Sequence, residues 1–310
     1  MAEIDIKELN ERLMAPKETL ADAEKAYHAF VADTADRVVS SEKIKIVMLA
    51  GPSGSGKTTT ANMLSDAIKA RGCDCLVVSL DDFYRNATDP EYPRLENGER
   101  DFEQPDALDI PCLLKTLSDI ADGKDFYLPR FDFKTASRKE VRKYEKITHG
   151  CVVIEGLHAL NPKISASLPE EKLLKIFISV STNVNIGEQR ILSGRKLRFV
   201  RRMVRDYLYR DADAEETLAL WDNVLHGEDL YLYPYRDLAN ISYDTFHGFE
   251  PGVMRPFVLR LISDSLAEKS TYAATVLSAM RHVVEIDESL VPETSLIREF
   301  IPGGKYDHLY

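Results

Sequence analysis

The sequence lacks the features that mark membrane, secreted, zinc-binding and nucleic-acid-binding proteins. Its 310 residues contain no apolar run of the roughly 18 residues needed to span a bilayer, and the charged N-terminus lacks the apolar core of a signal peptide. The four cysteines and seven histidines show no zinc-site spacing, since a single residue separates Cys73 from Cys75. A net charge of −11 disfavours binding to nucleic acid or to an anionic membrane. We therefore expect a soluble, cytoplasmic protein with free thiols.

A glycine-rich motif is the most specific feature that the sequence does contain. Residues 51–58 read GPSGSGKT, which fits the Walker A pattern G-x-x-x-x-G-K-S/T. In this pattern backbone N–H groups turn onto phosphate oxygens, the lysine reaches the outer phosphates and the last hydroxyl ligates Mg²⁺. We predict that the motif binds a nucleoside triphosphate. The residues expected to do so are Gly51, Ser53, Gly54, Ser55, Gly56, Lys57, Thr58 and Thr59.

The segments around the motif predict an α/β fold. Residues 44–50 are apolar and β-branched, as in a buried parallel strand, and residues 58–71 have apolar positions at helical spacing. Further apolar segments alternate with helical ones, at residues 75–80, 151–154, 174–180 and 239–243. This alternation predicts a P-loop NTPase fold, with a doubly wound, mainly parallel sheet covered by helices on both faces. We assign residues 43–250 to this domain, residues 1–42 to an N-terminal helical segment and residues 251–310 to a C-terminal helical extension.

Two acidic strand ends lie where such a sheet binds its ligands, which is beyond the carboxyl ends of the strands. Asp81 follows the second predicted strand, and Glu155 ends the third, as is typical of a Walker B position. We predict that Thr58, Asp81 and Glu155 hold Mg²⁺, and that Asp81 can also accept the proton of an attacking hydroxyl. The competing interpretation is that Asp81 and Asp82 cap a helix or form a turn.

Basic residues are concentrated in one short segment of this acidic chain. They are Arg190, Arg195, Lys196, Arg198, Arg201, Arg202, Arg205 and Arg210. Positions 198, 201, 202 and 205 are spaced i, i+3, i+4 and i+7, so a helix would present these guanidinium groups on one face. We predict a lid that closes on the triphosphate, stabilises its charge and excludes water. A solvated or RNA-contacting surface is the alternative.

Six motifs along the chain point to one family. They are residues 51–59, SLDDFYR at 79–85, DFEQPDALD at 101–109, FDFKTASR at 131–138, IEG at 154–156 and RRMVRD at 201–206. In content and order they resemble the uridine kinase and phosphoribulokinase family of P-loop kinases, most closely its uridine kinase branch. The resemblance covers about residues 44–246. It implies transfer of a phosphoryl group from ATP, with Mg²⁺, to a primary hydroxyl, which in uridine kinases is the ribose 5′-hydroxyl.

The resemblance also implies roles for individual residues. Asp81 matches the general base of the family, with Thr58 and Glu155 around the metal. Lys57 and Arg205 would assist Asp81 in catalysis by stabilising the charge on the transferred group. Arg202 matches a residue that holds the sugar. The lid residues expected near the ATP phosphates are Arg205 and Arg210.

The acceptor site of this chain departs from the family pattern. Uridine kinases carry an Asp that grips the ribose diol where this chain has Glu103, and a base-reading Tyr and His where it has Phe131 and Ala136. Since neither Phe131 nor Ala136 can donate those hydrogen bonds, pyrimidine specificity is open. Trp221 stands where the family usually has a polar residue near the substrate. The expected substrate-binding set is Asp81, Tyr84, Glu103, Phe131, Phe133 and Arg202, in which the two phenylalanines either stack on a ring or pack in the core.

Other nucleotide-binding classes fit the sequence less well. A regulatory GTPase needs D-x-x-G followed by N-K-x-D, and this chain has no D-x-x-G. A mechanical ATPase usually has two acids after the third strand, but Gly156 follows Glu155. A catalytically silent nucleotide-binding module is harder to dismiss. Its signature would be the loss of Lys57, Asp81 or Glu155, and all three are present.

We therefore expect an ATP-dependent kinase that transfers the γ-phosphoryl group, with Mg²⁺, to the 5′-hydroxyl of a uridine- or cytidine-like nucleoside. Pantothenate or a sugar phosphate is the alternative acceptor, because such kinases share the fold, the phosphate site and the base. The expected partner is a small molecule rather than nucleic acid or a membrane. The sequence leaves open whether the chain forms a homo-oligomer.

Overall fold

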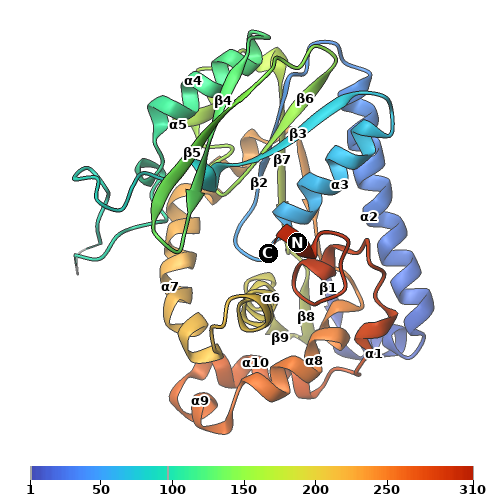
Figure 1. Cartoon of the computed structure of the whole chain (residues 1–310). Coiled ribbons are helices and arrows are strands. Elements are labelled where there is room, and N and C mark those ends of the chain that lie inside the picture. Colours follow the sequence, from blue (N-terminus) through green and yellow to red (C-terminus); the bar gives the residue numbers. More distant parts are fainter. Residues whose placement is uncertain (1, 96–97, 310) are drawn as a thin grey trace.

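A five-stranded parallel sheet forms the centre of the molecule (Figure 1). The computed structural model describes residues 2–95 and 98–309. From one edge to the other, the strands are β10 (Ile241–Asp244), β7 (Leu173–Ser179), β2 (Ile46–Ala50), β6 (Gly150–Glu155) and β3 (Asp74–Ser79). All neighbouring strands pair in parallel, which confirms the predicted parallel sheet. The strand that leads into the glycine-rich motif, β2, lies between β6 and β7.

Helices cover both faces of this sheet, because its strands are apolar on both faces. Val47 and Leu49 of β2 belong to one core, which they share with α2 (Pro16–Val39) and α3 (Lys57–Lys69). Ile46 and Met48 alternate with them and belong to a second core, shared with α4 (Ile110–Ala121) and α5 (Pro162–Ser165). This alternation is the two-residue period of a strand. Figure 1 shows the two pairs of helices on opposite sides of the sheet, so the predicted doubly wound fold is confirmed.

The remaining elements are a hairpin, a small second sheet and further helices. The hairpin pairs β4 (Phe126–Asp132) with β5 (Ser137–Tyr144), and the second sheet contains β1 (Glu3–Asp5), β8 (Asn183–Ile186) and β9 (Gln189–Leu192). The other α-helices are α1 (Ile6–Leu13), α6 (Gly194–Tyr209), α7 (Ala214–Tyr231), α8 (Glu250–Leu261), α9 (Asp264–Lys269) and α10 (Thr271–Arg281). Short 3₁₀ helices span Leu80–Phe83, Pro105–Ala107, Glu170–Lys172, Tyr233–Leu238, Glu288–Leu290, Leu296–Glu299 and Asp307–Leu309. Within the described ranges, no helix is both long and apolar enough to cross a membrane.

Both terminal segments contain helices, and both contribute to the core that contains α3. Leu9 of α1 and Leu20 of α2 are buried in it together with Leu296 and Phe300 from near the C-terminus. The spacing of the N-terminal leucines looks loose in the sequence because they come from two helices, the second of which starts at Pro16. Within each helix the buried positions recur at helical spacing.

Candidate active site

The glycine-rich loop connects β2 to α3, as the sequence predicts. Gly54 (φ +73) and Gly56 (φ +90) adopt left-handed backbone conformations that favour glycine. A Cβ atom on Gly54 would lie 2.7 Å from the carbonyl oxygen of Arg198, so a side chain there would collide with α6. Lys57 begins α3, and its Nζ donates to the carbonyl oxygen of Pro52 (3.1 Å), so the side chain folds back along the loop. The loop and the first turn of α3 thus form a phosphate-binding backbone.

The hydroxyl residues of the loop lie in different surroundings. Ser55 is fully buried, whereas Thr58 is half-buried. The amide of Thr59 donates to a carboxylate oxygen of Glu299, at 3.1 Å. Sequence reasoning missed Glu299, because no local pattern connects a residue so near the C-terminus with the start of α3.

Asp81 and Glu155 meet at the carboxyl edge of the sheet. Glu155 is the last residue of β6 and pairs in register with Ser79, the last residue of β3. Burial, together with the negative charge of Asp81, raises the pKa of Glu155 to about 7, and Lys57 opposes the rise. Desolvation also raises the pKa of Asp81, against the charges of Lys57, Arg210 and Arg205. Solvent still reaches the Asp81 side chain, so protein surrounds this carboxylate without sealing it.

Asp81 does not serve as the helix cap that the competing interpretation proposed. The short 3₁₀ helix Leu80–Phe83 is capped by Ser79, whose hydroxyl oxygen accepts from the amide of Asp81 at 3.3 Å. The neighbouring Asp82 accepts from the amide of Phe131, also at 3.3 Å, and so ties this turn to the hairpin. Both acids thus lie within this turn, as the competing interpretation allowed, but the Asp81 carboxylate does not cap it and feels the charge of Lys57.

The residues at this edge fit the hard cation that a kinase of this kind would use. Thr58, Asp81 and Glu155 offer only oxygen atoms as ligands. The two carboxylates repel one another, and a bound cation would neutralise their negative charge. Among the described residues, no group of three or more His, Cys, Asp or Glu side chains gathers as a metal cage. Mg²⁺ is commonly held by one or two carboxylates plus substrate phosphates rather than by such a cage. The donor set therefore fits Mg²⁺.

Helix α6 corrects the prediction that a line of arginines forms a lid. Arg198 and Arg201 are fully buried and form ion pairs with Glu228 of α7 and Glu250 of α8. They also bind the backbone of the phosphate loop: Arg198 donates to the carbonyl oxygen of Ser53 (2.8 Å) and Arg201 to that of Gly54 (3.1 Å). For these two arginines the lid prediction is wrong. Spacing revealed a shared helix face but not the buried carboxylates, which come from distant segments.

The other arginines of this helix are grouped around one carboxylate. Arg202, Arg205 and Arg210 lie 3.2, 2.8 and 3.4 Å from the carboxylate oxygens of Asp206. Arg202 also donates to the hydroxyl of Ser53 at 3.0 Å. Because Arg205 and Arg210 lower the pKa of Asp81, their charges act on the same region as the predicted base.

Glu103 lies beside Arg202 on the predicted acceptor side. Burial raises the pKa of Glu103 to about 7, and Arg202 opposes the rise. A Cβ atom on Gly227 of α7 would lie 2.4 Å from the Cβ of Glu103, so the absence of a side chain there makes room for this acid. Both residues line a cavity of about 180 Å³. Sequence reasoning missed Gly227, since an isolated glycine inside a helix carries no specific signal.

The predicted aromatic residues form one cluster with different exposures. The ring centroid of Tyr84 lies 5.6 Å from the ring centroid of Phe131 and 5.8 Å from that of Phe133. Phe131 is buried, whereas Phe133 is 59% exposed and could contact a ligand. Ala136 lies in the turn between β4 and β5 with φ +46. Trp221 is fully buried in the core, where it donates to the hydroxyl of Tyr272 (2.9 Å), so its side chain is not exposed to a substrate as the resemblance implied.

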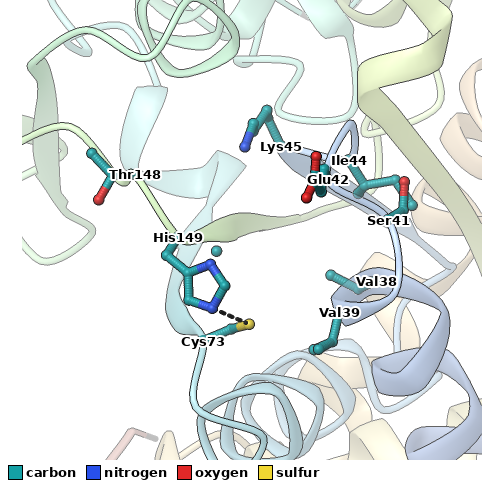
Figure 2. Close-up of a pocket in the computed structure, with 10 residues that line it drawn as sticks. Val38, Val39, Ser41, Glu42, Ile44, Lys45, Cys73, Thr148 and His149 are labelled. Atoms are coloured by element: carbon teal, nitrogen blue, oxygen red, sulfur yellow. Dashed lines mark hydrogen bonds between the residues drawn. The ribbon is translucent and has the colours of Figure 1, made fainter.

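A cavity at the amino ends of the strands is a poor candidate for the active site. It has a volume of about 340 Å³ and is lined by residues that precede β2, β3 and β6 (Figure 2). Cys73 and His149 contact one another there, with 3.4 Å between Sγ and Nε2. In a parallel sheet, ligands bind at the carboxyl ends of the strands, whereas this cavity lies at the amino ends.

The parallel sheet, the glycine-rich loop and the acids at the strand ends define a P-loop nucleotide-binding protein. The model of the Phosphoribulokinase / Uridine kinase family matches residues 46–246. The chain therefore belongs to this family of P-loop kinases, which confirms the resemblance seen in its motifs.

Individual relatives agree with this assignment. A uridine kinase of Borrelia hermsii (strain HS1 / DAH) is 30% identical over 199 residues, which cover 64% of this chain and 85% of the relative. Uridine-cytidine kinase-like 1 of Mus musculus is 29% identical over 204 residues; the match covers 65% of this chain and only 33% of the mouse protein. A solved structure described as a possible uridine kinase from Bacillus stearothermophilus has a TM-score of 0.49 and 16% identity, covering 71% of this chain and 98% of the other. Both sequence relatives are named as kinases, in agreement with the family that the chain belongs to.

The buried pair of Arg198 and Glu228 gives a stability prediction. In Glu228→Gln the Arg198 charge remains buried without its counter-charge, so we expect the free energy of unfolding to fall by about 3–5 kcal/mol. The control is Asp229→Asn. Asp229 follows Glu228 on α7 and forms an exposed ion pair with Arg195 of α6, so this substitution should lower the free energy of unfolding by about 0–1 kcal/mol. Urea unfolding measures both. Equal losses in the two variants would contradict the account of this pair.

The raised pKa of Glu155 predicts a pH-dependent stability. Because this pKa is higher in the folded than in the unfolded chain, the stability linked to protonation is complete below pH 4.5, the ordinary value, and is lost as the pH rises through about 7. Glu155→Gln removes this loss. Without metal or nucleotide, the variant should match the parent near pH 4.5 and exceed it by about 3 kcal/mol at pH 8.5. Denaturant unfolding at both pH values measures the difference, and a pH-independent difference would refute the raised pKa.

Proposed function

We propose that the chain is an ATP-dependent kinase that uses Mg²⁺ and phosphorylates the 5′-hydroxyl of a uridine- or cytidine-like nucleoside. The observation that carries this proposal is the position of Asp81. Its pKa responds to Lys57, Arg210 and Arg205, so a solvent-accessible carboxylate lies within the field of the groups that would bind the phosphates. Relatives named uridine kinase and uridine-cytidine kinase-like support the acceptor class.

In the proposed reaction, Asp81 takes the proton of the acceptor hydroxyl while the hydroxyl oxygen attacks the γ-phosphorus of ATP. A bond forms between the acceptor oxygen and the γ-phosphorus, the bond from that phosphorus to the β–γ bridging oxygen breaks, and ADP leaves with the electron pair. Lys57 and Arg205 would stabilise the charge on the transferred group, and Arg210 the other phosphates. When bound by Thr58, Asp81 and Glu155, Mg²⁺ would neutralise phosphate charge.

The acceptor would lie between the hairpin and α7. Glu103 would accept hydrogen bonds from the ribose hydroxyls, and Arg202, which is close enough to oppose the rise in the Glu103 pKa, would hold the same sugar. The exposed ring of Phe133, packed edge-on against Tyr84, offers a surface on which a base could stack. Stacking tolerates different bases, because every base has an aromatic face.

A kinase of another small hydroxyl acceptor, such as pantothenate or a sugar phosphate, is the second candidate. One observation favours it: the position that reads the base in uridine kinases is taken here by Ala136, which lies in a turn and has no hydrogen-bonding side chain. A catalytically silent module is less well supported, because Lys57, Asp81 and Glu155 are all present and interact electrostatically.

A substitution at Asp81 tests the proposed base. Asp81→Asn should lower phosphoryl transfer by about 10²–10⁴-fold, since the amide cannot accept the proton, while Mg·ADP should still bind through the loop, Thr58 and Glu155. Asp82→Asn is the matched control, because Asp82 contacts the backbone of the hairpin, and it should keep most of the turnover. Steady-state kinetics and titration with Mg·ADP give the two readouts. Unchanged turnover in Asp81→Asn would exclude Asp81 as the base.

A panel of acceptors tests the proposed substrate. The protein is incubated with Mg·ATP and, in separate reactions, uridine, cytidine, a purine nucleoside, pantothenate and sugar phosphates, and ADP release is measured. We expect uridine and cytidine to raise ADP release well above the rate without acceptor. A response to pantothenate or a sugar phosphate alone would support the second candidate, and no response to any acceptor would favour the silent module.

A further inference from the structure

A carboxylate of the protein itself accepts a hydrogen bond from the predicted phosphate-binding backbone. The Glu299 side chain accepts from the amide of Thr59 at 3.1 Å, and only 4% of the residue is exposed. Thr59 is the third residue of α3, so its amide is one of the first-turn N–H groups that cradle phosphates in a Walker A site. Because the backbone N–H groups of a Walker A loop cradle the α- and β-phosphates, whereas its lysine reaches the outer ones, Glu299 would compete for an inner phosphate position rather than for the transferred one.

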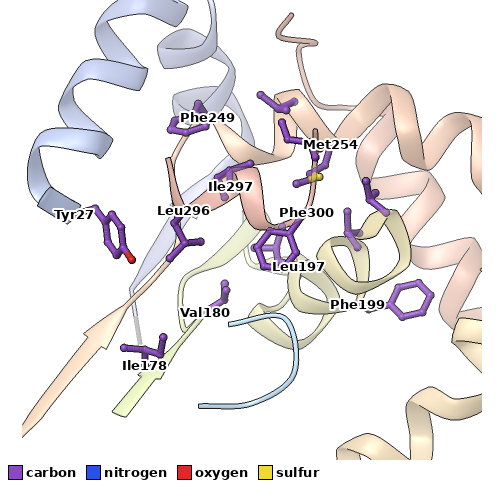
Figure 3. Packing of buried hydrophobic residues seen from close by; sticks show 14 of the residues in the cluster. Tyr27, Ile178, Val180, Leu197, Phe199, Phe249, Met254, Leu296, Ile297 and Phe300 are labelled. Atoms are coloured by element: carbon purple, nitrogen blue, oxygen red, sulfur yellow. The ribbon is translucent and has the colours of Figure 1, made fainter. Parts of the chain in front are cut away.

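The chain carries this carboxylate on a segment that packs directly on the phosphate loop. We call residues 291–306 the C-terminal strap. Within it, the 3₁₀ helix Leu296–Glu299 lies against the loop, since a Cβ atom on Gly56 would be 2.6 Å from a methyl carbon of Leu296. Figure 3 shows Leu296, Ile297 and Phe300 among the residues of the surrounding core, and all three are fully buried. The ring of Phe300 also faces the guanidinium of Arg201, at 5.2 Å.

The C-terminal end of the strap is hydrogen-bonded to α3. Lys305 Nζ and the hydroxyl of Tyr306 donate to one carboxylate oxygen of Asp66, at 2.6 and 2.7 Å. Asp66 lies in α3, which also carries the Thr59 amide. The strap is thus held against α3 by its apolar side chains at one end and by polar contacts at the other, and together these contacts keep Glu299 at the start of the helix.

The charge of Glu299 is balanced by the start of the helix. In the described ranges 2–95 and 98–309, no lysine, arginine or histidine forms an ion pair with it, whereas the N-terminus of α3 favours any anion through its N–H groups and dipole. Glu299 also raises the pKa of Glu155, so its charge reaches the predicted metal-binding edge. A bound nucleotide would bring a phosphate to the site that this carboxylate occupies.

We propose that Glu299 is a built-in competitor of the nucleotide: its carboxylate occupies an inner phosphate position of the loop, and the nucleotide must displace it to bind. This inference rests on nucleotide binding at the loop, which is part of the proposed function, but not on the identity of the acceptor. The C-terminal strap thereby sets the nucleotide affinity of the kinase, and any event that loosens the strap raises that affinity.

The test compares two charge-neutral substitutions on the same strap. Glu299→Gln keeps the shape and an accepting oxygen but removes the charge, so we expect Mg·ADP to bind about tenfold more tightly than to the parent. Glu293→Gln is the matched control, since Glu293 is exposed on the strap, and it should bind within about twofold of the parent. Isothermal titration with Mg·ADP measures both, and circular dichroism checks that both variants are folded.

A second variant covers the case in which Glu299→Gln fails to fold. Asp66→Asn weakens the contacts of Lys305 and Tyr306 with α3, and it should tighten Mg·ADP binding in the same direction. Unchanged or weaker binding in Glu299→Gln would overturn the inference, and weaker binding would make Glu299 a nucleotide contact instead. If the variant binds Mg·ADP more tightly but no nucleoside is phosphorylated, the inference stands and the proposed acceptor fails. If uridine is phosphorylated and the affinities are equal, the inference alone fails.

Discussion

The phosphate loop depends on two buried arginine–carboxylate pairs beneath it. Arg198 with Glu228, and Arg201 with Glu250, place two guanidinium groups on the carbonyl oxygens of the loop. A loop that turns its N–H groups toward phosphates must turn carbonyl oxygens the other way, and in a protein interior these need donors. The arginines supply them, and the carboxylates from α7 and α8 compensate the arginine charge. Three helices are thus fixed relative to the loop before any ligand binds.

Positively and negatively charged side chains both gather at the carboxyl ends of the strands. Arg205 and Arg210 act on Asp81, whereas Glu155 is buried deeply enough for its pKa to rise to about 7. Carboxylates that repel one another near an anion-binding loop favour the binding of a cation together with a phosphate. The C-terminal strap adds the carboxylate of Glu299, which accepts from the Thr59 amide at the start of α3 and raises the pKa of Glu155 further.

The sequence predicted the parts of this structure that local patterns encode. The five parallel strands, the loop before α3 and the acids at the ends of β3 and β6 all follow from short apolar runs and one motif. It could not predict which arginines are buried, because Glu228 and Glu250 meet α6 only in the folded chain. The burial of Trp221 and the contact of Glu299 could not be predicted for the same reason: their surroundings come from segments far away in the sequence. The hairpin β4–β5 escaped notice because its solvent-facing strand, Ser137–Tyr144, is mostly charged.

The central claim is that the phosphate loop and Asp81 together transfer a phosphoryl group to a primary hydroxyl. The most direct measurement is the structure of the product formed from uridine and Mg·ATP, read by phosphorus NMR and mass spectrometry. The account predicts one added phosphate, with the phosphorus coupled to the two protons on the 5′ carbon of the ribose. Phosphate on another hydroxyl, or release of inorganic phosphate while uridine remains unmodified, would contradict it.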